Sequence, residues 1–111
     1  MRPDFELERI RMFNCDCMEF MEKIPDNCYD IIITSPPYNI GKVHSTGGYR
    51  HSPYKDDYPE KEYQKQQIDI INQCIRILKN DGSLFYNHKN RIRDKKTITP
   101  YSWILQSNAV L

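Results

Sequence analysis

The stretch Asp30-Ile31-Ile32-Ile33-Thr34-Ser35-Pro36-Pro37-Tyr38-Asn39-Ile40 decides how the chain folds. Three consecutive β-branched residues, Ile31 to Ile33, predict a strand that is buried on both faces. That strand must end at Pro36, because proline donates no ladder hydrogen bond and two prolines cannot continue a central strand. Ligands of open α/β sheets bind beyond the carboxyl ends of strands. The rigid Ser-Pro-Pro-Tyr segment is therefore a candidate active site.

The segments before this strand predict an α/β fold. Residues 1–9 are charged and should be irregular, and residues 10–14 have the composition of a short strand. Residues 17–23 have an apolar helical face, and Asp16 is placed to cap that helix. A turn at 25–27 leads into the buried strand. Strand, helix, turn and strand in succession are typical of a mostly parallel sheet with flanking helices.

The clearest helical pattern follows over 60–79, where apolar residues recur every three or four positions. Asn80-Asp81-Gly82 should end this helix, with the glycine in the left-handed cap conformation. The run 83–87 predicts a second buried strand, and residues 101–111 predict a last helix. The buried side of that helix would carry Trp103, Ile104 and Leu105.

The chain of 111 residues is long enough for one small domain with its own core, and its charge is unevenly distributed. Residues 1–41 contain four Lys/Arg and eight Asp/Glu, a net charge of −4, whereas residues 42–111 contain twelve and seven, a net charge of +5. The basic part is either a surface that faces phosphates or a set of solvated loops and helix faces.

Several classes of protein are excluded by what the sequence lacks. It has no apolar run near the length of a membrane span and no signal-peptide pattern, so we expect a cytoplasmic protein. The four cysteines form no Cys-x-x-Cys pair and have no histidine at zinc spacing. We therefore expect reduced, partly buried thiols and no metal site.

The Ser-Pro-Pro-Tyr segment suits the chemistry of an aromatic exocyclic amine, such as that of cytosine or adenine. This amine is a poor nucleophile because its lone pair is delocalised into the ring, and a protein activates it by accepting both amino hydrogens. Ser35 Oγ and the Pro36 carbonyl, held by the stiff Pro36-Pro37 backbone, are candidate acceptors. Tyr38 is a candidate for stacking on a flipped base. The alternative is a proline turn that only ends the strand.

Residues 34–39 resemble the catalytic (Asp/Asn/Ser)-Pro-Pro-(Tyr/Phe/Trp) motif of the DNA amino-methyltransferases, which methylate cytosine N4 or adenine N6 with S-adenosyl-L-methionine. Residues 14–18 with 24–30 are similar to the Gly-Asp-Cys … Leu-Pro-Asp-Asn-Ser-Val-Asp lead-in of that family. Residues 76–84 are similar to its Arg-Leu-Leu-Lys-Pro-Gly-Gly segment. The resemblance covers about residues 10–105 and implies a partial Rossmann-like fold and a site-specific methyltransferase of a restriction–modification or phage type.

The resemblance also implies roles for individual residues. Cys15, Asp16 and Ser35 would lie at the cofactor site, with Asp16 accepting a hydrogen bond from the adenosyl part of S-adenosyl-L-methionine. Asp16 is equally placed to cap a helix, and the two roles can coexist. Serine at the first motif position favours cytosine N4 as the target and leaves adenine N6 open.

Candidate DNA contacts follow the motif. The polar stretch 41–58 has no periodicity, which predicts a mobile loop, and residues 89–96 are basic. The candidates are Asn39, Lys42, Tyr49, Tyr54, Lys89, Arg91 and Arg93. The alternatives are that Asn39 only shapes the turn and that the loop and the basic run are solvated.

The family holds the methionine end of its cofactor with a Phe-x-Gly-x-Gly turn, and this chain contains no Gly-x-Gly. The early position of the Pro-Pro-Tyr strand resembles the permuted class, in which that turn and the target-recognition region come later. We therefore expect residues 1–111 to be one partial domain, the N-terminal catalytic half, with negligible activity alone. It would act on double-stranded DNA together with a C-terminal half or a second chain, and its incomplete sheet allows a homodimer.

Two other functions are compatible with the same residues. The chain could be a non-catalytic remnant that acts as a DNA-binding or interaction module, since the glycine turn is missing. It could also come from an enzyme that methylates RNA or a protein amide, because the tetrapeptide alone also serves those substrates.

Overall fold

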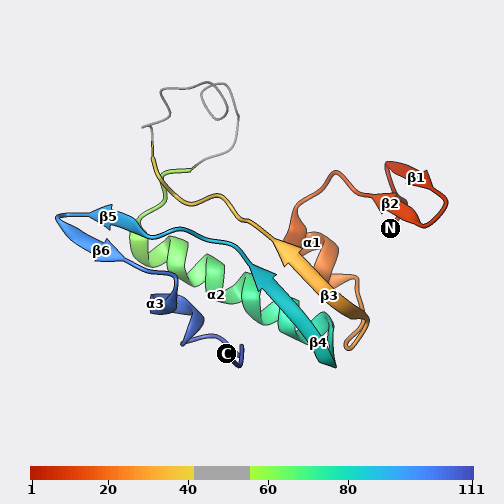
Figure 1. Cartoon of the computed structure of the whole chain (residues 1–111). Helices are drawn as coiled ribbons and strands as arrows, with labels where there is room; N and C mark the ends of the chain where they lie inside the picture. Colours follow the sequence, from red (N-terminus) through yellow and green to blue (C-terminus); the bar gives the residue numbers. More distant parts are fainter. Residues whose placement is uncertain (42–55) are drawn as a thin grey trace.

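The computed structural model describes residues 1–41 and 56–111, so most of the loop expected over 41–58, with Lys42, Tyr49 and Tyr54, lies outside the described residues. No helix in the described part is long and apolar enough to cross a membrane. Figure 1 shows the order of the elements. They are β1 (Phe5–Leu7), β2 (Ile10–Met12), α1 (Cys17–Glu22), β3 (Tyr29–Thr34), α2 (Glu60–Ile77), β4 (Leu78–Tyr86), β5 (Arg91–Arg93), β6 (Lys96–Ile98) and α3 (Tyr101–Ile104).

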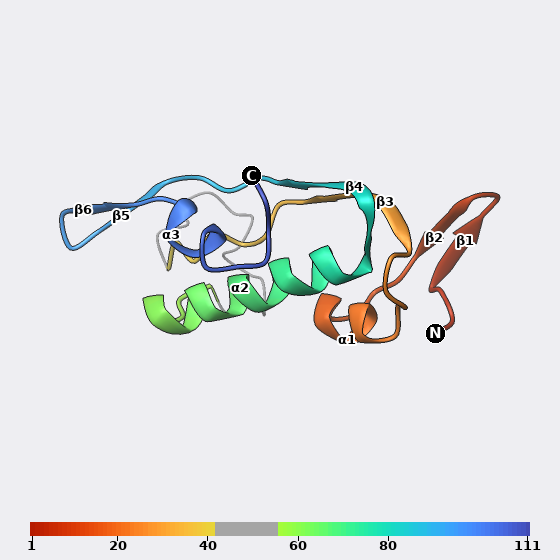
Figure 2. The same cartoon turned by 90° about the horizontal axis from the view of Figure 1, so that it is seen from below.

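The centre of the fold is the β3–α2–β4 unit, which confirms the α/β unit expected from the sequence. β3 and β4 pair in parallel, and α2 connects them and lies along one face of the pair. Figure 2 shows α1 and α3 on the same side of this pair as α2. A parallel pair needs such a crossover, because a tight hairpin joins only antiparallel strands.

The expectation of one mostly parallel sheet holds only for β3 and β4. The described strands form three two-stranded sheets, of which β1–β2 and β5–β6 are antiparallel hairpins. β2 therefore pairs with β1 rather than joining β3. Phe5 and Leu7 alternate with charged residues, so residues 5–7 form a strand instead of the irregular start expected from their charge. Glu8, with φ 49°, makes the tight turn between the two strands.

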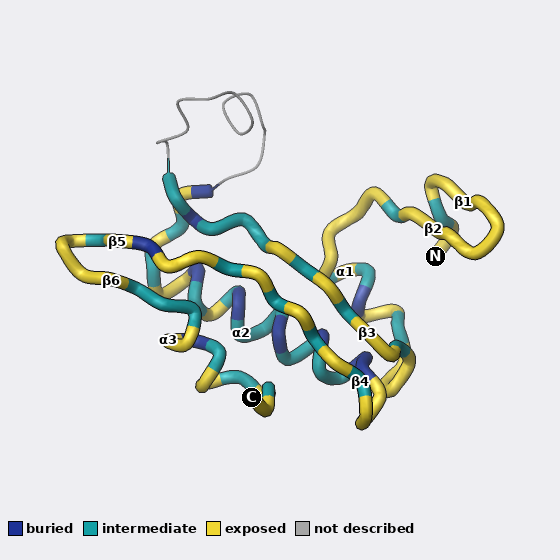
Figure 3. Tube along the Cα trace, viewed as in Figure 1, coloured by how far each residue is buried: buried dark blue, intermediate teal, exposed yellow. Residues whose placement is uncertain are grey.

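Two clusters of buried side chains lie between α2 and its neighbours, and Figure 3 shows the buried positions gathered along α2. The first consists of Met21, Cys74 and Ile77, beneath α1 and the start of β3. The second consists of Tyr63, Ile71 and Trp103 and joins α2 to α3. Burial raises the pKa of Cys74 to about 11, so this thiol stays protonated. All four cysteines are free thiols.

The strands are not buried on both faces, which corrects the prediction made from Ile31 to Ile33. Ile32 faces the helices, but Ile31 and Ile33 are 58% and 79% exposed, and Phe85 on β4 is 56% exposed. α2 covers one face of the pair, and no described element covers the other. The unbroken apolar run therefore marks a strand whose second face is bare in this chain.

The junction between α2 and β4 also differs from the prediction. α2 ends at Ile77, Leu78 is already extended with ψ 144°, and residues 80–82 lie within β4. Gly82 does not adopt a positive φ. Glycine is needed here because the backbone of β3 passes very close: a Cβ at position 82 would lie 2.8 Å from the Asp30 carbonyl oxygen. This contact lies where the β3–β4 register shifts, between Tyr29 and Ile31.

The last helix is shorter than the sequence suggested. α3 ends at Ile104, and Leu105 is exposed rather than on the buried side. Trp103 is fully buried, as expected. A four-residue helix makes little more than one turn, so only part of it faces the core, and Leu105 lies outside that part.

We predict that Gly82→Ala lowers the free energy of unfolding by about 1–3 kcal/mol, because the new Cβ meets backbone oxygens of Asp30 and Lys79 that cannot move without breaking the strand pairing. Urea unfolding followed by circular dichroism measures the change. Ser83→Ala, next to it on an exposed position of β4, is the control and should change stability by less than about 0.5 kcal/mol. Equal stability of the two variants would contradict the close approach.

Candidate active site at the carboxyl ends of the parallel strands

The parallel pairing continues one step beyond the two strands. The backbone N–H of Asn87 donates a hydrogen bond to the Thr34 carbonyl at 2.9 Å. The residues that leave the carboxyl ends of β3 and β4 are thereby held side by side. Ser35 begins one of these segments and Asn87 begins the other.

Ser35, Tyr38 and Asn87 form a polar cluster at this edge. Ser35 Oγ and Tyr38 Oη are 3.0 Å apart and share a hydrogen bond. The Asn87 amide Nδ2 donates to Tyr38 Oη at 3.1 Å and, over a longer distance of 3.4 Å, to Ser35 Oγ. The structure thus brings together two of the predicted catalytic residues. It adds Asn87, which sequence reasoning missed as a site residue because it was assigned to the end of the predicted strand 83–87, whereas β4 ends at Tyr86.

A side chain of α2 forms a hydrogen bond with the proline pair. Tyr63, which is 1% exposed, donates its hydroxyl hydrogen to the Pro37 carbonyl at 2.5 Å. His88 Nε2 lies 2.7 Å from the same hydroxyl oxygen. The His88 ring also packs against Tyr38 at 4.8 Å and against Trp103 at 4.9 Å between ring centroids. The segment that carries the motif is therefore held both at its edge and from the core.

Asn39 is a structural residue in this fold. It is fully buried, with φ 57°, and its side chain forms two hydrogen bonds with the backbone of Tyr58: Nδ2 donates to the carbonyl at 2.8 Å and Oδ1 accepts from N–H at 2.7 Å. Asp56 accepts from the backbone N–H of Asn39 at 2.9 Å. Asparagine tolerates this left-handed conformation better than most residues. These contacts favour the turn-shaping alternative and count against the DNA contact expected for Asn39.

Arg91 is also buried and paired within the chain, which counts against its expected role at phosphates. Its side chain is 3% exposed, and both terminal nitrogens donate to Glu60 carboxylate oxygens at 2.8 Å. Burial alone would raise the pKa of Glu60, but the bonds from Arg91 and Gln64 and the charges of Arg91 and Arg93 outweigh it and lower that pKa. The pair fastens β5 to the first turn of α2.

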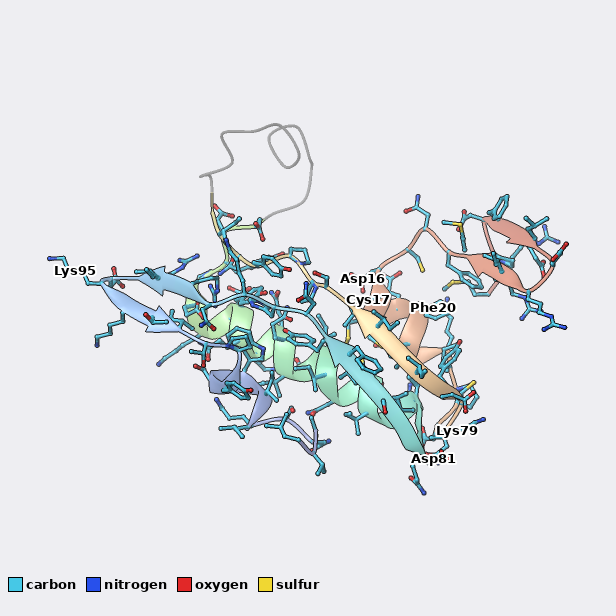
Figure 4. The ribbon with its side chains drawn as sticks, viewed as in Figure 1. Asp16, Cys17, Phe20, Lys79, Asp81 and Lys95 are labelled. Atoms are coloured by element: carbon cyan, nitrogen blue, oxygen red, sulfur yellow. The ribbon has the colours of Figure 1, made fainter. Side chains whose placement is uncertain are left out.

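The remaining basic residues are distributed differently. Arg93 is partly exposed and donates from Nη2 to the Asn39 carbonyl at 2.7 Å. Lys89 is exposed. Figure 4 shows Lys95 at the tip of the β5–β6 hairpin, which follows directly from the site. In the part of the chain that follows β4, the exposed cations are Lys89, Lys95 and Lys96.

Two of the three residues expected at the cofactor, Cys15 and Asp16, lie just before α1, where Figure 4 labels Asp16. Asp16 caps the helix as predicted: its Oδ1 accepts from the backbone N–H groups of Met18 at 2.8 Å and Glu19 at 3.3 Å. Cys15 is exposed and lines a hollow of about 630 Å³ between the β1–β2 hairpin and α1. No hydrogen bond within the described part of the chain joins either residue to Ser35.

The helix cap uses only one of the two carboxylate oxygens of Asp16. Both cap hydrogen bonds end on Oδ1. Within the described residues, the second carboxylate oxygen, Oδ2, accepts no hydrogen bond. A carboxylate oxygen accepts from a ribose hydroxyl or an adenine amine. Helix capping and cofactor binding are therefore compatible at this one side chain.

Comparisons with known proteins match most of the chain to DNA methyltransferases. The model of the N6/N4 methyltransferase family, described as DNA methylase, matches residues 29–109. The type II methyltransferase M.BglII of Bacillus subtilis is 38% identical over 90 residues, which are 81% of this chain and 22% of the relative. M.BamHI of Bacillus amyloliquefaciens is 33% identical over 88 residues, 78% of this chain and 19% of the relative. The chain spans about a fifth of the length of these curated relatives.

We predict that Glu60→Gln lowers the free energy of unfolding at pH 7 by about 3 kcal/mol, because it leaves the charge of Arg91 buried without a counter-charge. Since the folded-state pKa of Glu60 is lowered, the stabilisation is present above its ordinary value of 4.5 and is lost as the pH falls through the folded value. Urea titrations between pH 7 and pH 3 should therefore show wild type and variant converging in acid.

Asp69→Asn is the matched control, because it removes an exposed i,i+4 pair with Lys65 from the same helix. Its effect should stay below about 0.5 kcal/mol at every pH. A pH-independent difference between wild type and Glu60→Gln would show that the carboxylate charge is not what stabilises Arg91.

Proposed function

Because the chain belongs to the family of DNA methylases, we propose that it provides the amine-binding part of a site that methylates an exocyclic amino group of cytosine or adenine in double-stranded DNA. The observation that carries this proposal is the cluster of Ser35, Tyr38 and Asn87 at the carboxyl ends of a parallel strand pair. We infer that β3, α2 and β4 are part of a Rossmann-like domain to which other residues of the whole protein contribute.

Ser35 Oγ and the Pro36 carbonyl oxygen accept the two hydrogens of the target amine. Each acceptor draws the nitrogen toward a tetrahedral shape, in which its lone pair is available for attack. When bound, S-adenosyl-L-methionine would supply an electrophilic methyl group, and its sulfonium sulfur would keep the electron pair of the broken S–C bond as a neutral thioether. The amine nitrogen becomes positively charged as its bond to the methyl carbon forms, and one of its two hydrogens then leaves as a proton to water. No strong base is needed before that point.

Tyr38 holds the target base outside the double helix by stacking on its ring. The contact between Tyr38 and His88 supports this role, because it fixes the plane of the tyrosine ring before a base arrives. Lys89, Lys95 and Lys96 reach phosphates beside the flipped base. Arg91 and Asn39 are assigned to the support of this surface rather than to DNA.

The serine at the first motif position favours cytosine N4 over adenine N6. The type II methyltransferases among the relatives support a role in a restriction–modification system. Because the chain contains no Gly-x-Gly segment, we propose that it does not methylate DNA alone and that the methionine end of the cofactor is held by residues outside this sequence.

The test is a chimera of M.BglII in which this chain replaces the 90 residues that it matches. We expect the chimera to transfer tritiated methyl groups from S-adenosyl-L-methionine to duplex DNA, and nucleoside analysis of the product to identify the methylated base. Ser35→Ala should lower kcat by about 100-fold, because one acceptor of the amine hydrogens is lost. The isolated chain should show no transfer.

Thr34→Ser is the control for Ser35→Ala, since it changes a neighbouring hydroxyl residue whose backbone, not its side chain, pairs with Asn87. A folded chimera that binds S-adenosyl-L-methionine yet methylates no DNA would favour the non-catalytic remnant. Transfer to RNA or to protein in preference to duplex DNA would replace the proposed substrate.

We predict that the two roles of Asp16 separate by substitution. Asp16→Ala should lower the free energy of unfolding by about 1 kcal/mol, because the cap of α1 is lost, whereas Asp16→Asn keeps an oxygen for the cap and stays within a few tenths. Both variants should weaken binding of S-adenosyl-L-methionine to the chimera by about tenfold in calorimetry, because the charged acceptor is lost. Unchanged binding in Asp16→Asn would leave the residue as a helix cap only.

A further inference from the structure

We propose that Tyr63 is a positioning residue of the methylation site: backed by His88, it holds the Pro37 carbonyl and thereby sets the direction of the backbone that presents the Pro36 carbonyl and Tyr38. The inference rests on the proposed function. It concerns a residue of α2 that lies 26 positions from Pro37 in the sequence and takes no part in the Ser-Pro-Pro-Tyr motif.

The count of hydrogens at Tyr63 gives the direction of each bond. Its hydroxyl has one hydrogen, and it lies 2.5 Å from the Pro37 oxygen and 2.7 Å from His88 Nε2. Two oxygens at 2.5 Å in a buried place need a hydrogen between them, and a carbonyl has none to give. The tyrosine hydrogen therefore goes to Pro37. The hydrogen between Tyr63 and His88 must then come from Nε2.

This direction fixes the tautomer of His88. Burial lowers the pKa of His88; the hydrogen bond to the Lys89 carbonyl opposes this second in size, and the charge of Arg91 then acts in the same direction as burial. The ring is therefore neutral at pH 7 and carries a single hydrogen. With that hydrogen on Nε2, Nδ1 and the Lys89 carbonyl oxygen, which lie 2.8 Å apart, are both acceptors and no longer form a hydrogen bond. Because this contact is exposed, the two acceptors can move apart and each bond to water instead.

The alternative tautomer is worse for the interior of the site. A hydrogen on Nδ1 would satisfy the exposed Lys89 carbonyl, but Nε2 would then have to accept the hydrogen of Tyr63. The Pro37 oxygen would be left against the Tyr63 oxygen with no hydrogen between them. An unpaired buried carbonyl costs more than an exposed one, which keeps its bonds to water.

The Pro37 carbonyl matters because little else at the proline pair is free to rotate. Both proline rings fix φ, so ψ of Pro36 and of Pro37 are the remaining soft dihedrals of this segment. The bond from Tyr63 fixes ψ of Pro37, and with it the entry of the chain into Tyr38. Tyr38 is then held at its other end by Ser35 and Asn87. A misplacement of about 1 Å at a reacting group can cost two orders of magnitude in rate.

Ring-nitrogen NMR of this chain tests the hydrogen-bond assignment without requiring activity. We expect the assigned His88 resonances at pH 7.5 to show a protonated Nε2 and a bare Nδ1. Tyr63→Phe should remove the acceptor of that hydrogen and shift the Pro37 carbonyl carbon upfield as its hydrogen bond is lost. A bare Nε2 in the wild type would overturn the proposal, because the hydrogen of Tyr63 would then go to His88.

Methylation by the M.BglII chimera tests the positioning role. Tyr63→Phe should lower kcat by about tenfold or more and leave KM for S-adenosyl-L-methionine within about twofold. Tyr86→Phe is the control for a lost buried hydroxyl: the Tyr86 hydroxyl donates to Gln67 and accepts from Trp103 Nε1 at 3.1 Å, and neither bond involves Pro37. Its kcat should stay near that of the wild type. His88→Gln, whose amide nitrogen can donate to Tyr63 where Nε2 did, should retain most of the rate.

The outcomes separate the two proposals. Equal kcat for Tyr63→Phe and the wild type would overturn the positioning role and leave the proposed function standing. A loss of rate as large in Tyr86→Phe as in Tyr63→Phe would also overturn it, since general destabilisation would then explain both. Absence of methylation in every folded chimera, including the wild type, would overturn the proposed function while the NMR result still decides the hydrogen bond.

Discussion

The hydrogen bond from the Asn87 N–H to the Thr34 carbonyl is the contact on which the candidate site depends. It extends the parallel pairing past the end of both strands, so that two segments 52 residues apart leave the sheet in a fixed relation. An antiparallel pair would have placed the start of one segment beside the end of the other. The parallel arrangement instead puts two strand ends together, and each contributes polar groups to the same edge.

α2 connects these strand ends to the core. Its first turn carries Glu60, which pairs with Arg91, and its next turn carries Tyr63, which reaches Pro37. Gln67, one turn further, accepts a hydrogen bond from the Tyr86 hydroxyl. These three positions lie on one face of the helix, three or four residues apart. The crossover that makes the strands parallel is therefore also the support for the residues that follow both of them.

The sequence was sufficient for features that depend on neighbouring residues. The end of β3 at the prolines, the cap of α1 by Asp16 and the extent of α2 to within two residues were predicted from local patterns, because propensity, capping and apolar period act over a few positions. The family resemblance placed the site at Ser35 to Tyr38. That resemblance is confirmed by the match over residues 29–109, whereas the roles of the individual residues stay predictions.

Features set by distant contacts could not be predicted in the same way. Tyr63 recurs with other apolar residues at helical spacing, which is typical of an ordinary core residue. No neighbouring residue indicates that its hydroxyl contacts the Pro37 carbonyl. The sequence around Gly82 is typical of a helix cap, but the structure places Gly82 in β4, where the Asp30 carbonyl leaves no room for a side chain. Ile31 and Ile33 had the pattern of a central strand, yet their exposure depends on which elements cover the sheet. A signal for Asn87 was present, in its position at the end of the predicted strand 83–87.

The cluster at the strand ends also bears on how a serine can act as the amine acceptor. A carboxylate at this position has no hydrogen and always accepts, but a serine hydroxyl must first place its own hydrogen elsewhere. Tyr38 Oη lies 3.0 Å from Ser35 Oγ and can accept that hydrogen. Asn87 Nδ2 donates to both oxygens and cannot accept the serine hydrogen, because an amide nitrogen has no available lone pair. With its hydrogen on Tyr38, Ser35 keeps a lone pair for the amine. Tyr38, for which we propose stacking on the base, would thus also fix the direction of the Ser35 hydroxyl hydrogen, so that the two residues act together.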